Sequence, residues 1–192
     1  MFEMKRMSRR VAQSIFAGLL TAALAHGQAA PSAYGAGASL WAGAEYSNVH
    51  AGFPIDSTVR LQGVGAFVDF NRSHSIGFEG HFRFLQLGNW YGETEQNYLA
   101  GPRYTFLHSE KWRPFASFEI GAVKIQYPFN MGNGTSFAMA PGGGLEYRLS
   151  RKWSVRSAFE YQILTNSPDF TNEPRFGIKP YGFHGGISYR IF

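Results

Sequence analysis

The sequence predicts an all-β fold, a closed antiparallel up-and-down transmembrane β-barrel of about eight strands. Most of the chain alternates between apolar residues and charged, hydroxyl or glycine residues, as residues 76–84 do, and a period of two is that of a strand. Glycines collect on the charged face, where a solvated strand would only lose stability but a narrow barrel interior needs small residues. Short turns alternate with longer polar connections, as in bacterial outer-membrane barrels.

The first segment predicts export from the cytoplasm. An apolar stretch over residues 11–24 follows four basic residues, Lys5, Arg6, Arg9 and Arg10. This stretch is shorter than the about 20 apolar residues of a membrane-spanning helix, and Ala23 and Ala25 give a small-x-small cleavage pattern. We therefore assign residues 1–25 to a secretory signal peptide, cut near residues 25–30, and residues 31–192 to the barrel. The alternative is an amphipathic N-terminal helix of the folded domain.

Composition narrows the function classes. From residue 26 onward Lys plus Arg fall from 18 to 14 and Asp plus Glu from 13 to 12, so the formal charge falls from +5 to +2. This small excess does not indicate a nucleic-acid partner. The chain has no Cys, which excludes a disulfide framework and a thiolate metal site. We expect lipid around a fully hydrogen-bonded barrel to provide the stability instead.

The first four predicted strands cover residues 38–46, 61–70, 76–84 and 97–106. Each alternates aliphatic or aromatic residues on one parity with glycines or charged residues on the other. In a membrane barrel the apolar residues of each strand face the lipid. We therefore assign the aliphatic and aromatic residues to the outer face and the glycines and charged residues to the interior.

The other four predicted strands cover residues 114–126, 137–149, 153–164 and 181–192, with the same alternation. Short turns follow Phe70, Phe106 and Leu149. The longer stretches, rich in Gly, Pro, Asn or Asp, are residues 47–60, 88–96, 127–136 and 165–180. We predict that the four long loops lie outside the cell and that the turns and both termini lie in the periplasm.

Four stretches of this sequence resemble a known family. They are Gly101-Pro102-Arg103-Tyr104, Trp112-Arg113-Pro114-Phe115, the run Gly-Gly-Gly-Leu-Glu-Tyr-Arg-Leu over residues 142–149, and Tyr189-Arg190-Ile191-Phe192. Together they are similar to the small OmpA-like outer-membrane β-barrel family, over roughly residues 34–192. The resemblance implies a porin-like barrel in the cell envelope and is weak for any activity. Family members with a cell-wall role carry a further peptidoglycan-binding domain, and we expect the barrel domain only.

The C-terminus resembles the aromatic-ended signal that barrel-assembly machinery recognises. In the usual pattern the last Phe shares its parity with the outward aromatic residues. Here Tyr189 and Ile191 have the outward parity and Phe192 is one step out of phase. Either a terminal bulge corrects the phase or Phe192 is a loose end.

Charged residues of both signs have the inward parity, and we predict that they form an interior polar network. Its members are Glu45, Glu79, His81, Arg83, Arg103, Glu119, Glu146, Arg148, Arg156, Glu160 and Arg190. Buried charges are normally paired, so we interpret the network as a plug of ion pairs in a barrel too narrow for a water channel. The alternative is a proton or ion pathway.

The opposite parity carries the residues that we predict to face lipid. They are Ile76, Phe78, Phe82, Phe84, Tyr104, Phe118, Ile120, Tyr147, Phe159, Tyr161, Phe183 and Tyr189. In the predicted loops, Trp90, Tyr91 and Tyr127 suit an interfacial aromatic girdle. Phe53, Phe129 and Phe170 remain open between that role and contact with an extracellular ligand.

Catalysis and metal binding have little support in the sequence. His184 and Ser188 share one strand, but the His-x-Ser-Asn run expected of the lipid A deacylases is missing. The six His are scattered without ligand spacing. We therefore expect no catalytic residues, no cofactor and no metal.

The sequence thus predicts an integral outer-membrane barrel of structural or surface-interaction type that is not an enzyme. Its expected partners are outer-membrane lipid, lipopolysaccharide and the barrel-assembly machinery, with an unidentified extracellular ligand at the loops as a further option. The alternatives are passage of a small solute or lipid through the barrel, or a lipid A-modifying enzyme.

Overall fold

A computed structural model describes residues 38–52, 60–72, 75–87, 94–106, 109, 111–126, 133–165 and 177–192. The predicted signal peptide lies outside these residues, as do Phe53, Trp90, Tyr91, Tyr127, Phe129 and Phe170 of the predicted loops. No helix long and apolar enough to cross a membrane occurs in the described part of the chain.

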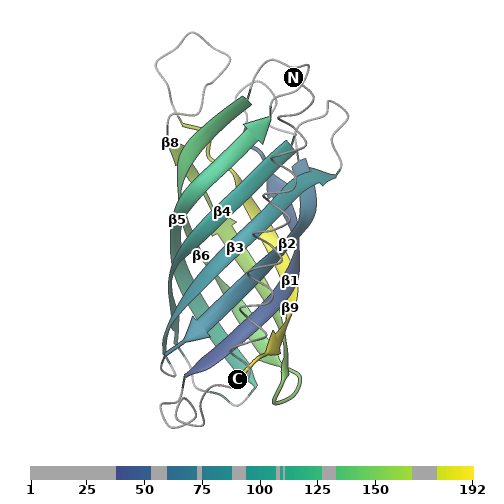
Figure 1. The fold of residues 1–192 in the computed structure, drawn as a ribbon, viewed down its shortest axis with the longest axis vertical. Coiled ribbons are helices and arrows are strands. Elements are labelled where there is room, and N and C mark those ends of the chain that lie inside the picture. Colours follow the sequence, from purple (N-terminus) through teal and green to yellow (C-terminus); the bar gives the residue numbers. More distant parts are fainter. Residues whose placement is uncertain are drawn as a thin grey trace, which may run out of the picture. The chain divides into compact units, whose positions relative to one another are not determined.

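The described chain consists of strands that wind around one axis (Figure 1). The strands are β1 (Ser39–His50), β2 (Arg60–Asn71), β3 (Ile76–Leu87), β4 (Thr94–Thr105), β5 (Trp112–Gln126), β6 (Asn133–Arg148), β7 (Trp153–Tyr161), β8 (Ile163–Thr165) and β9 (Tyr181–Arg190).

Antiparallel pairing closes these strands into a barrel. Neighbours pair in chain order from β1 to β6, β6 pairs with β7 and β8, and β9 pairs with both β7 and β1. The circuit returns to its first strand, so none of the described strands β1 to β9 forms an open edge of the sheet. The predicted closed antiparallel up-and-down barrel is confirmed.

The strands β7 and β8 are two parts of one barrel strand. Both pair with β6, in successive stretches, and the ladder to β6 is interrupted at Tyr161 and Gln162. The backbone N–H of Gln162 donates to the carbonyl oxygen of Pro180 at 2.7 Å, and that of Leu164 donates to Ile178 at 3.0 Å. The barrel therefore has eight strands around its wall, as the sequence predicts.

The strands are longer than predicted at the loop end, so one predicted loop begins too early in the chain and two end too late. Residues 47–50 belong to β1, residues 94–96 to β4 and residues 133–136 to β6. These segments are polar, which is why their composition suggested loops. Ladder hydrogen bonds with a neighbouring strand hold them extended all the same; Asn48, for example, lies opposite Gln62.

Two inward glycines show why this wall needs residues without a side chain. A Cβ atom at Gly101 would clash with the carbonyl oxygen of Phe118, and one at Gly121 would clash with that of Tyr98. Both clashes involve backbone of the neighbouring strand, which cannot rotate away. The glycines on the charged parity thus allow the strands to curve tightly around a narrow interior.

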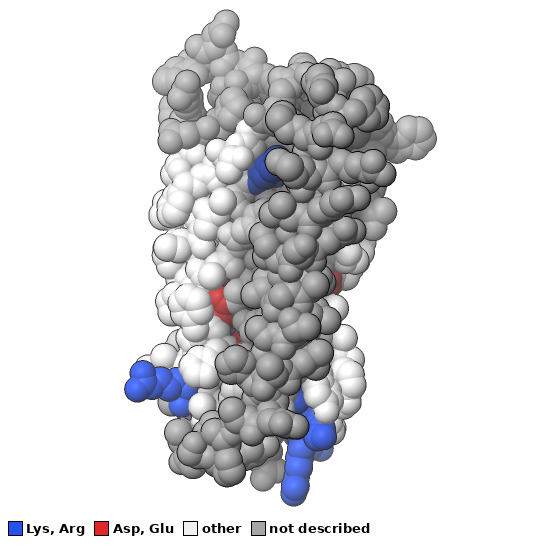
Figure 2. Space-filling view, viewed as in Figure 1, with Lys and Arg blue, Asp and Glu red and all other residues white. Residues whose placement is uncertain are grey.

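The outer wall is apolar along its middle. Side chains such as Ile76, Phe78 and Phe183 are exposed by 53 to 65 %, and charged residues are sparse on the part of the wall drawn white in Figure 2. Lys and Arg gather at the end that carries the short turns (Figure 2). Near this end Trp112 contacts Tyr147 in a tilted arrangement and Trp153 contacts Tyr189 edge to face, with ring centroids 4.5 and 5.0 Å apart. An apolar band with aromatic residues at its margin is the outer surface of a membrane barrel.

The chain ends in a local bulge. The backbone N–H of Ile191 donates to the carbonyl oxygen of Leu40 at 2.8 Å, while the N–H of Leu40 donates to the carbonyl oxygen of Phe192 at 3.2 Å. Ile191 and Phe192, the two residues after β9, therefore lie opposite the single residue Leu40 of β1, as in a β-bulge. Of the two options that the sequence left open for Phe192, the hydrogen bonds favour the terminal bulge.

Phe82 lies near the middle of β3, with its side chain 44 % exposed on the outer wall. Because a guanidinium at that depth would lose its hydration in lipid, we expect Phe82→Arg to lower the free energy of unfolding by about 2 to 4 kcal/mol. Denaturant titration of protein refolded into vesicles measures this, with Phe82→Leu as the control that should change little. Equal stability of the Arg variant and the parent would show that this face does not meet lipid.

The positions of the loops and turns predict which sites a protease can reach. Trypsin added to intact cells should cut at Arg60 or at Arg175, which lies outside the described residues, because both belong to the predicted extracellular end. Arg151 and Lys152 are exposed in the turn before β7 and should survive, because we place that turn in the periplasm. Cleavage at Arg151 or Lys152 in sealed cells, with Arg60 and Arg175 protected, would show the opposite orientation.

Candidate functional site

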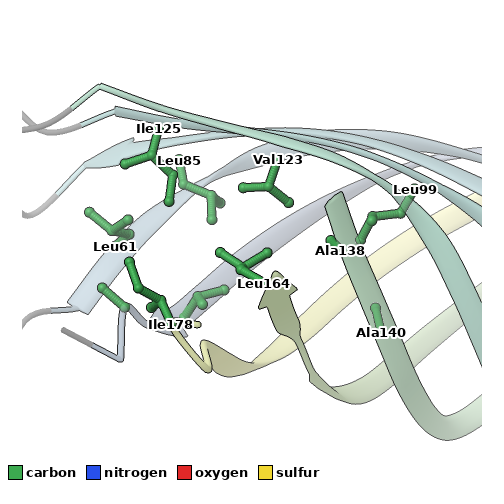
Figure 3. Packing of buried hydrophobic residues seen from close by; sticks show 11 residues of the cluster. Leu61, Leu85, Leu99, Val123, Ile125, Ala138, Ala140, Leu164 and Ile178 are labelled. Atoms are coloured by element: carbon green, nitrogen blue, oxygen red, sulfur yellow. The ribbon is translucent and has the colours of Figure 1, made fainter. Parts of the chain in front are cut away.

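The barrel interior contains two layers of buried side chains, one charged and one apolar. The apolar layer lies toward the loop end and packs residues from seven strands, from the segment after β1 and from the segment before β9 (Figure 3). Its members are Val49, Ala51, Leu61, Leu85, Leu99, Val123, Ile125, Ala138, Ala140, Leu164 and Ile178. We expected only charges, hydroxyls and glycines on the inward face, so the sequence-based description of the interior is wrong at this end. Leu99 and Val123 have the inward parity, so the alternation itself indicated apolar side chains in the interior.

Arg83 joins three strands in the charged layer. Its Nε donates to Glu45 Oε1 at 2.6 Å, and its Nη1 donates to Glu160 Oε1 at 2.8 Å. Gln162 Nε2 donates to the same Glu160 oxygen at 2.8 Å. Arg83 is only 2 % exposed, so these carboxylates replace the water that its guanidinium would otherwise bind.

Arg103 and Arg156 form a second group of ion pairs around Asp69. Arg103 donates to Asp69 Oδ2 at 2.7 Å and to Glu146 Oε2 at 2.6 Å. Arg156 lies 3.4 Å from Asp69 and 3.4 Å from Glu79 Oε2. Asp69 was absent from the predicted network. Asp69 lies between the outward residues Val68 and Phe70 in the sequence and therefore has the inward parity, which would have identified it.

Inward aromatic rings complete the surroundings of these guanidinium groups. The Cζ atom of Arg103 lies 3.9 Å from the ring centroid of Phe115, and that of Arg156 lies 4.2 Å from the ring of Phe67. A cation over a buried ring is attracted to its negative face. The alternation places both rings on the inward parity, so the sequence contained the signal for them, although the predicted network consists of charged residues alone.

His81 lies at the centre of the charged layer. Its Nδ1 is 3.0 Å from Glu45 Oε1, while its Nε2 faces Glu79 Oε2 at 3.7 Å and Glu119 Oε1 at 3.6 Å. The ligand atoms of Glu79, His81 and Glu119 all lie within 4.8 Å of one another and are buried.

The structure brings nine of the eleven predicted network residues together as buried side chains. Arg148 and Arg190 are only partly buried. Arg148 lies 5.8 Å from the ring centroid of Trp41, and Arg190 Nε donates to the carbonyl oxygen of Phe192 at 3.0 Å. Arg113, which the prediction lacked, lies 3.8 Å from Glu146.

The predicted outward residues form the outer wall. Ile76, Phe78, Phe82, Tyr104, Phe118, Ile120, Phe159 and Phe183 are exposed, and Phe84, Tyr147, Tyr161 and Tyr189 are partly exposed. Neighbouring rings pack on each other across strands, as Phe82 does on Tyr98 and Phe159 on Phe183, with centroids 5.1 Å apart in both pairs.

His184 does not pair with Ser188. Its Nδ1 lies 2.9 Å from Ser47 Oγ on the neighbouring strand β1, and both side chains are buried. A histidine beside a serine hydroxyl is the first element of a nucleophilic site. Both side chains are buried inside the barrel, however, with exposures of 0 and 2 %.

Comparisons with known proteins identify the architecture. The sequence matches the family described as outer membrane protein beta-barrel domain over residues 15–190. Comparison with curated proteins found no match.

Solved structures with a similar fold include the N-terminal β-barrel domain of Pseudomonas aeruginosa OprF, with a TM-score of 0.57, 12 % identity, and coverage of 79 % of this chain and 96 % of that one. Neisserial surface protein A is similar with a TM-score of 0.57, 10 % identity, and coverage of 80 and 96 %. The outer membrane protein OprG of Pseudomonas aeruginosa has a TM-score of 0.52, 11 % identity, and coverage of 81 and 96 %.

Because these sequence identities are low, the similar structures support the fold alone. The match to the family, in contrast, extends over nearly the whole chain. The resemblance to small OmpA-like barrels is confirmed. The chain belongs to the outer membrane protein beta-barrel family and resides in the bacterial outer membrane.

Proposed function

We propose that this protein is a non-enzymatic outer-membrane barrel of structural or surface-interaction type whose interior is plugged. The observation that carries the proposal is the interior itself, in which ion pairs between strands lie beneath a packed apolar layer. Such an interior supports a rigid scaffold for the loops and opposes passage of solutes.

The charged layer favours a plugged interior because its members form ion pairs with one another. Arg83 binds Glu45 and Glu160, and Arg103 binds Asp69 and Glu146, at distances between 2.6 and 2.8 Å. A hydrated pore would leave such side chains solvated by water. Here the pairs connect strands that lie on different sides of the wall, so they span the lumen.

The apolar layer supports the plug at the other end. Leu61, Leu85, Val123 and Leu164 are each exposed by no more than 1 %. A packed apolar constriction excludes water, and with it ions. A solute that entered from the loop side would meet this layer before it reached the ion pairs of the charged layer.

The residues also favour a barrel without enzymatic activity. The acyl-modifying activity weighed from the sequence needs a histidine, a serine and an acidic residue that converge at the membrane interface. His184 instead contacts Ser47 inside the barrel. Loops on a rigid scaffold are a common place for recognition, which is why we assign contact with the cell's surroundings to the loops.

We extend the proposal to partners and processing. Lipid and lipopolysaccharide contact the predicted outward residues, the C-terminal strand with its bulge engages the barrel-assembly machinery, and residues 1–25 are removed as a secretory signal peptide. An extracellular ligand, if one exists, binds the loops.

A plugged barrel should not conduct ions. We expect the refolded protein in a planar lipid bilayer to give only the baseline current of the bilayer, measured against the same detergent without protein. Discrete current steps that scale with the amount of protein would contradict the plug and favour passage of small solutes.

Removing one arginine should destabilise the barrel strongly. Arg103→Ala leaves Asp69 and Glu146 buried without their shortest ion pairs, so we expect the free energy of unfolding to fall by about 3 to 5 kcal/mol. Lys152→Ala, in an exposed turn, is the control and should stay within about 0.5 kcal/mol of the parent. An Arg103→Ala loss below about 1 kcal/mol would mean that water hydrates the two carboxylates, and would count against a sealed interior.

A further inference from the structure

Glu119 differs from the other carboxylates of the charged layer. Glu45, Asp69, Glu79, Glu146 and Glu160 each lie within 4.0 Å of an arginine nitrogen. The only ion-pair partner of Glu119 in the described part of the chain is His81, at 3.6 Å. Its side chain is 2 % exposed, and its Oε2 has no hydrogen-bond partner there. A buried carboxylate without such a partner is costly, so its surroundings call for a cation.

The hydrogen bond of His81 orients the imidazole toward Glu119. An ionised carboxylate can only accept a hydrogen bond, so the 3.0 Å contact with Glu45 assigns the ring proton to Nδ1. In the neutral imidazole Nε2 then carries the lone pair, and this atom lies 3.7 Å from Glu79 Oε2 and 3.6 Å from Glu119 Oε1. Arg156 Nη2 lies 3.4 Å from both His81 Nε2 and Glu79 Oε2, whereas Glu119 Oε1 faces Nε2 without an arginine beside it, so a further positive charge is needed at Glu119. A carboxylate that holds the far nitrogen of a histidine is the usual support of a metal-ligating imidazole.

The ion-pair network has an excess of negative charge. It joins the carboxylates of Glu45, Asp69, Glu79, Glu119, Glu146 and Glu160 to the guanidinium groups of only Arg83, Arg103, Arg113 and Arg156. With His81 neutral, the network therefore lacks two positive charges. One divalent cation would balance it.

The backbone makes room for the three groups to meet. Glu79 and His81 lie on β3 and Glu119 lies on β5, with β4 between them. At the crossing point β4 carries Gly101, which pairs with Glu79 and lies against the backbone of Glu119. Because Gly101 has no side chain, the two carboxylates can approach each other across it.

We propose that Glu79, His81 and Glu119 bind a divalent transition-metal ion of zinc type, with water as a fourth ligand. Ligand atoms at about 2.0 to 2.2 Å from zinc, at tetrahedral to trigonal angles, lie about 3.4 to 3.7 Å from one another. The separations of His81 Nε2 from the two carboxylate oxygens, 3.7 and 3.6 Å, fall in this range. Imidazole nitrogen together with carboxylate oxygen suits zinc and its neighbours. Glu45 holds His81, and Arg156 contacts Glu79, so both would orient ligands from the outside.

Metal content tests the proposal. The parent protein, extracted from outer membranes in detergent without unfolding, should contain about one transition-metal ion per barrel by elemental analysis. After refolding in the presence of a chelator, added Co²⁺ should produce the visible absorption bands of a four-coordinate site. Added Zn²⁺ should raise the unfolding temperature with increasing concentration. These measurements need no variant, so they remain decisive if a substitution prevents folding.

Glu119→Gln removes one ligand charge and should weaken Co²⁺ affinity by at least about tenfold. Glu160→Gln is the matched control, because Glu160 is a buried carboxylate of the same layer that contacts Arg83 and not the proposed ion; it should keep the metal. Circular dichroism checks that each variant is folded. Absence of metal from the extracted parent together with no Co²⁺ absorption would overturn the proposal and indicate that protons balance the charge. Equal affinity of Glu119→Gln and the parent, or equal loss in the control, would also overturn it.

Discussion

The need to pair every backbone N–H and C=O group determines most of this structure. Lipid offers these groups no hydrogen-bond partner, so strands can span a membrane only when their ladder closes on itself. Here the closure joins β9 to β1, and the ladder hydrogen bonds continue to the last residue. Closure also divides all side chains into an outer set that meets lipid and an inner set that must fill a narrow space together.

The inner set fills that space in two ways. Toward the loops, aliphatic side chains pack as they do in a soluble core. Farther down, long charged side chains reach across the lumen, and aromatic rings such as Phe67 and Phe115 lie against their guanidinium groups. Burying charge in this way adds little net stability, but removing one partner is expensive. The charged layer therefore favours a single arrangement of the interior, and this suits a rigid support for loops.

Strand positions followed from the sequence because the period-two alternation is a local property. Each strand of the wall was predicted within a few residues, and the errors lie at the loop ends, where polar residues such as Asn48 are held extended by partners far away in the chain. Asp69, Arg113 and the inward rings were missed for a different reason. Their inward parity follows from the alternation, as does that of the apolar residues Leu99 and Val123. Parity alone, however, does not say which inward side chains contact one another, because such contacts form between strands that are distant in the sequence.

By itself, the sequence determined the closed barrel, its number of strands and the face on which each side chain lies, because alternation, turns and glycine placement act between near neighbours. Only the tertiary structure decided which acid meets which base. Arg83 contacts Glu160 across 77 positions of the chain, and Glu119 meets His81 over Gly101 of the strand between them. Such meetings depend on the register and tilt of every strand in the closed ladder, so no single segment of the sequence contains them.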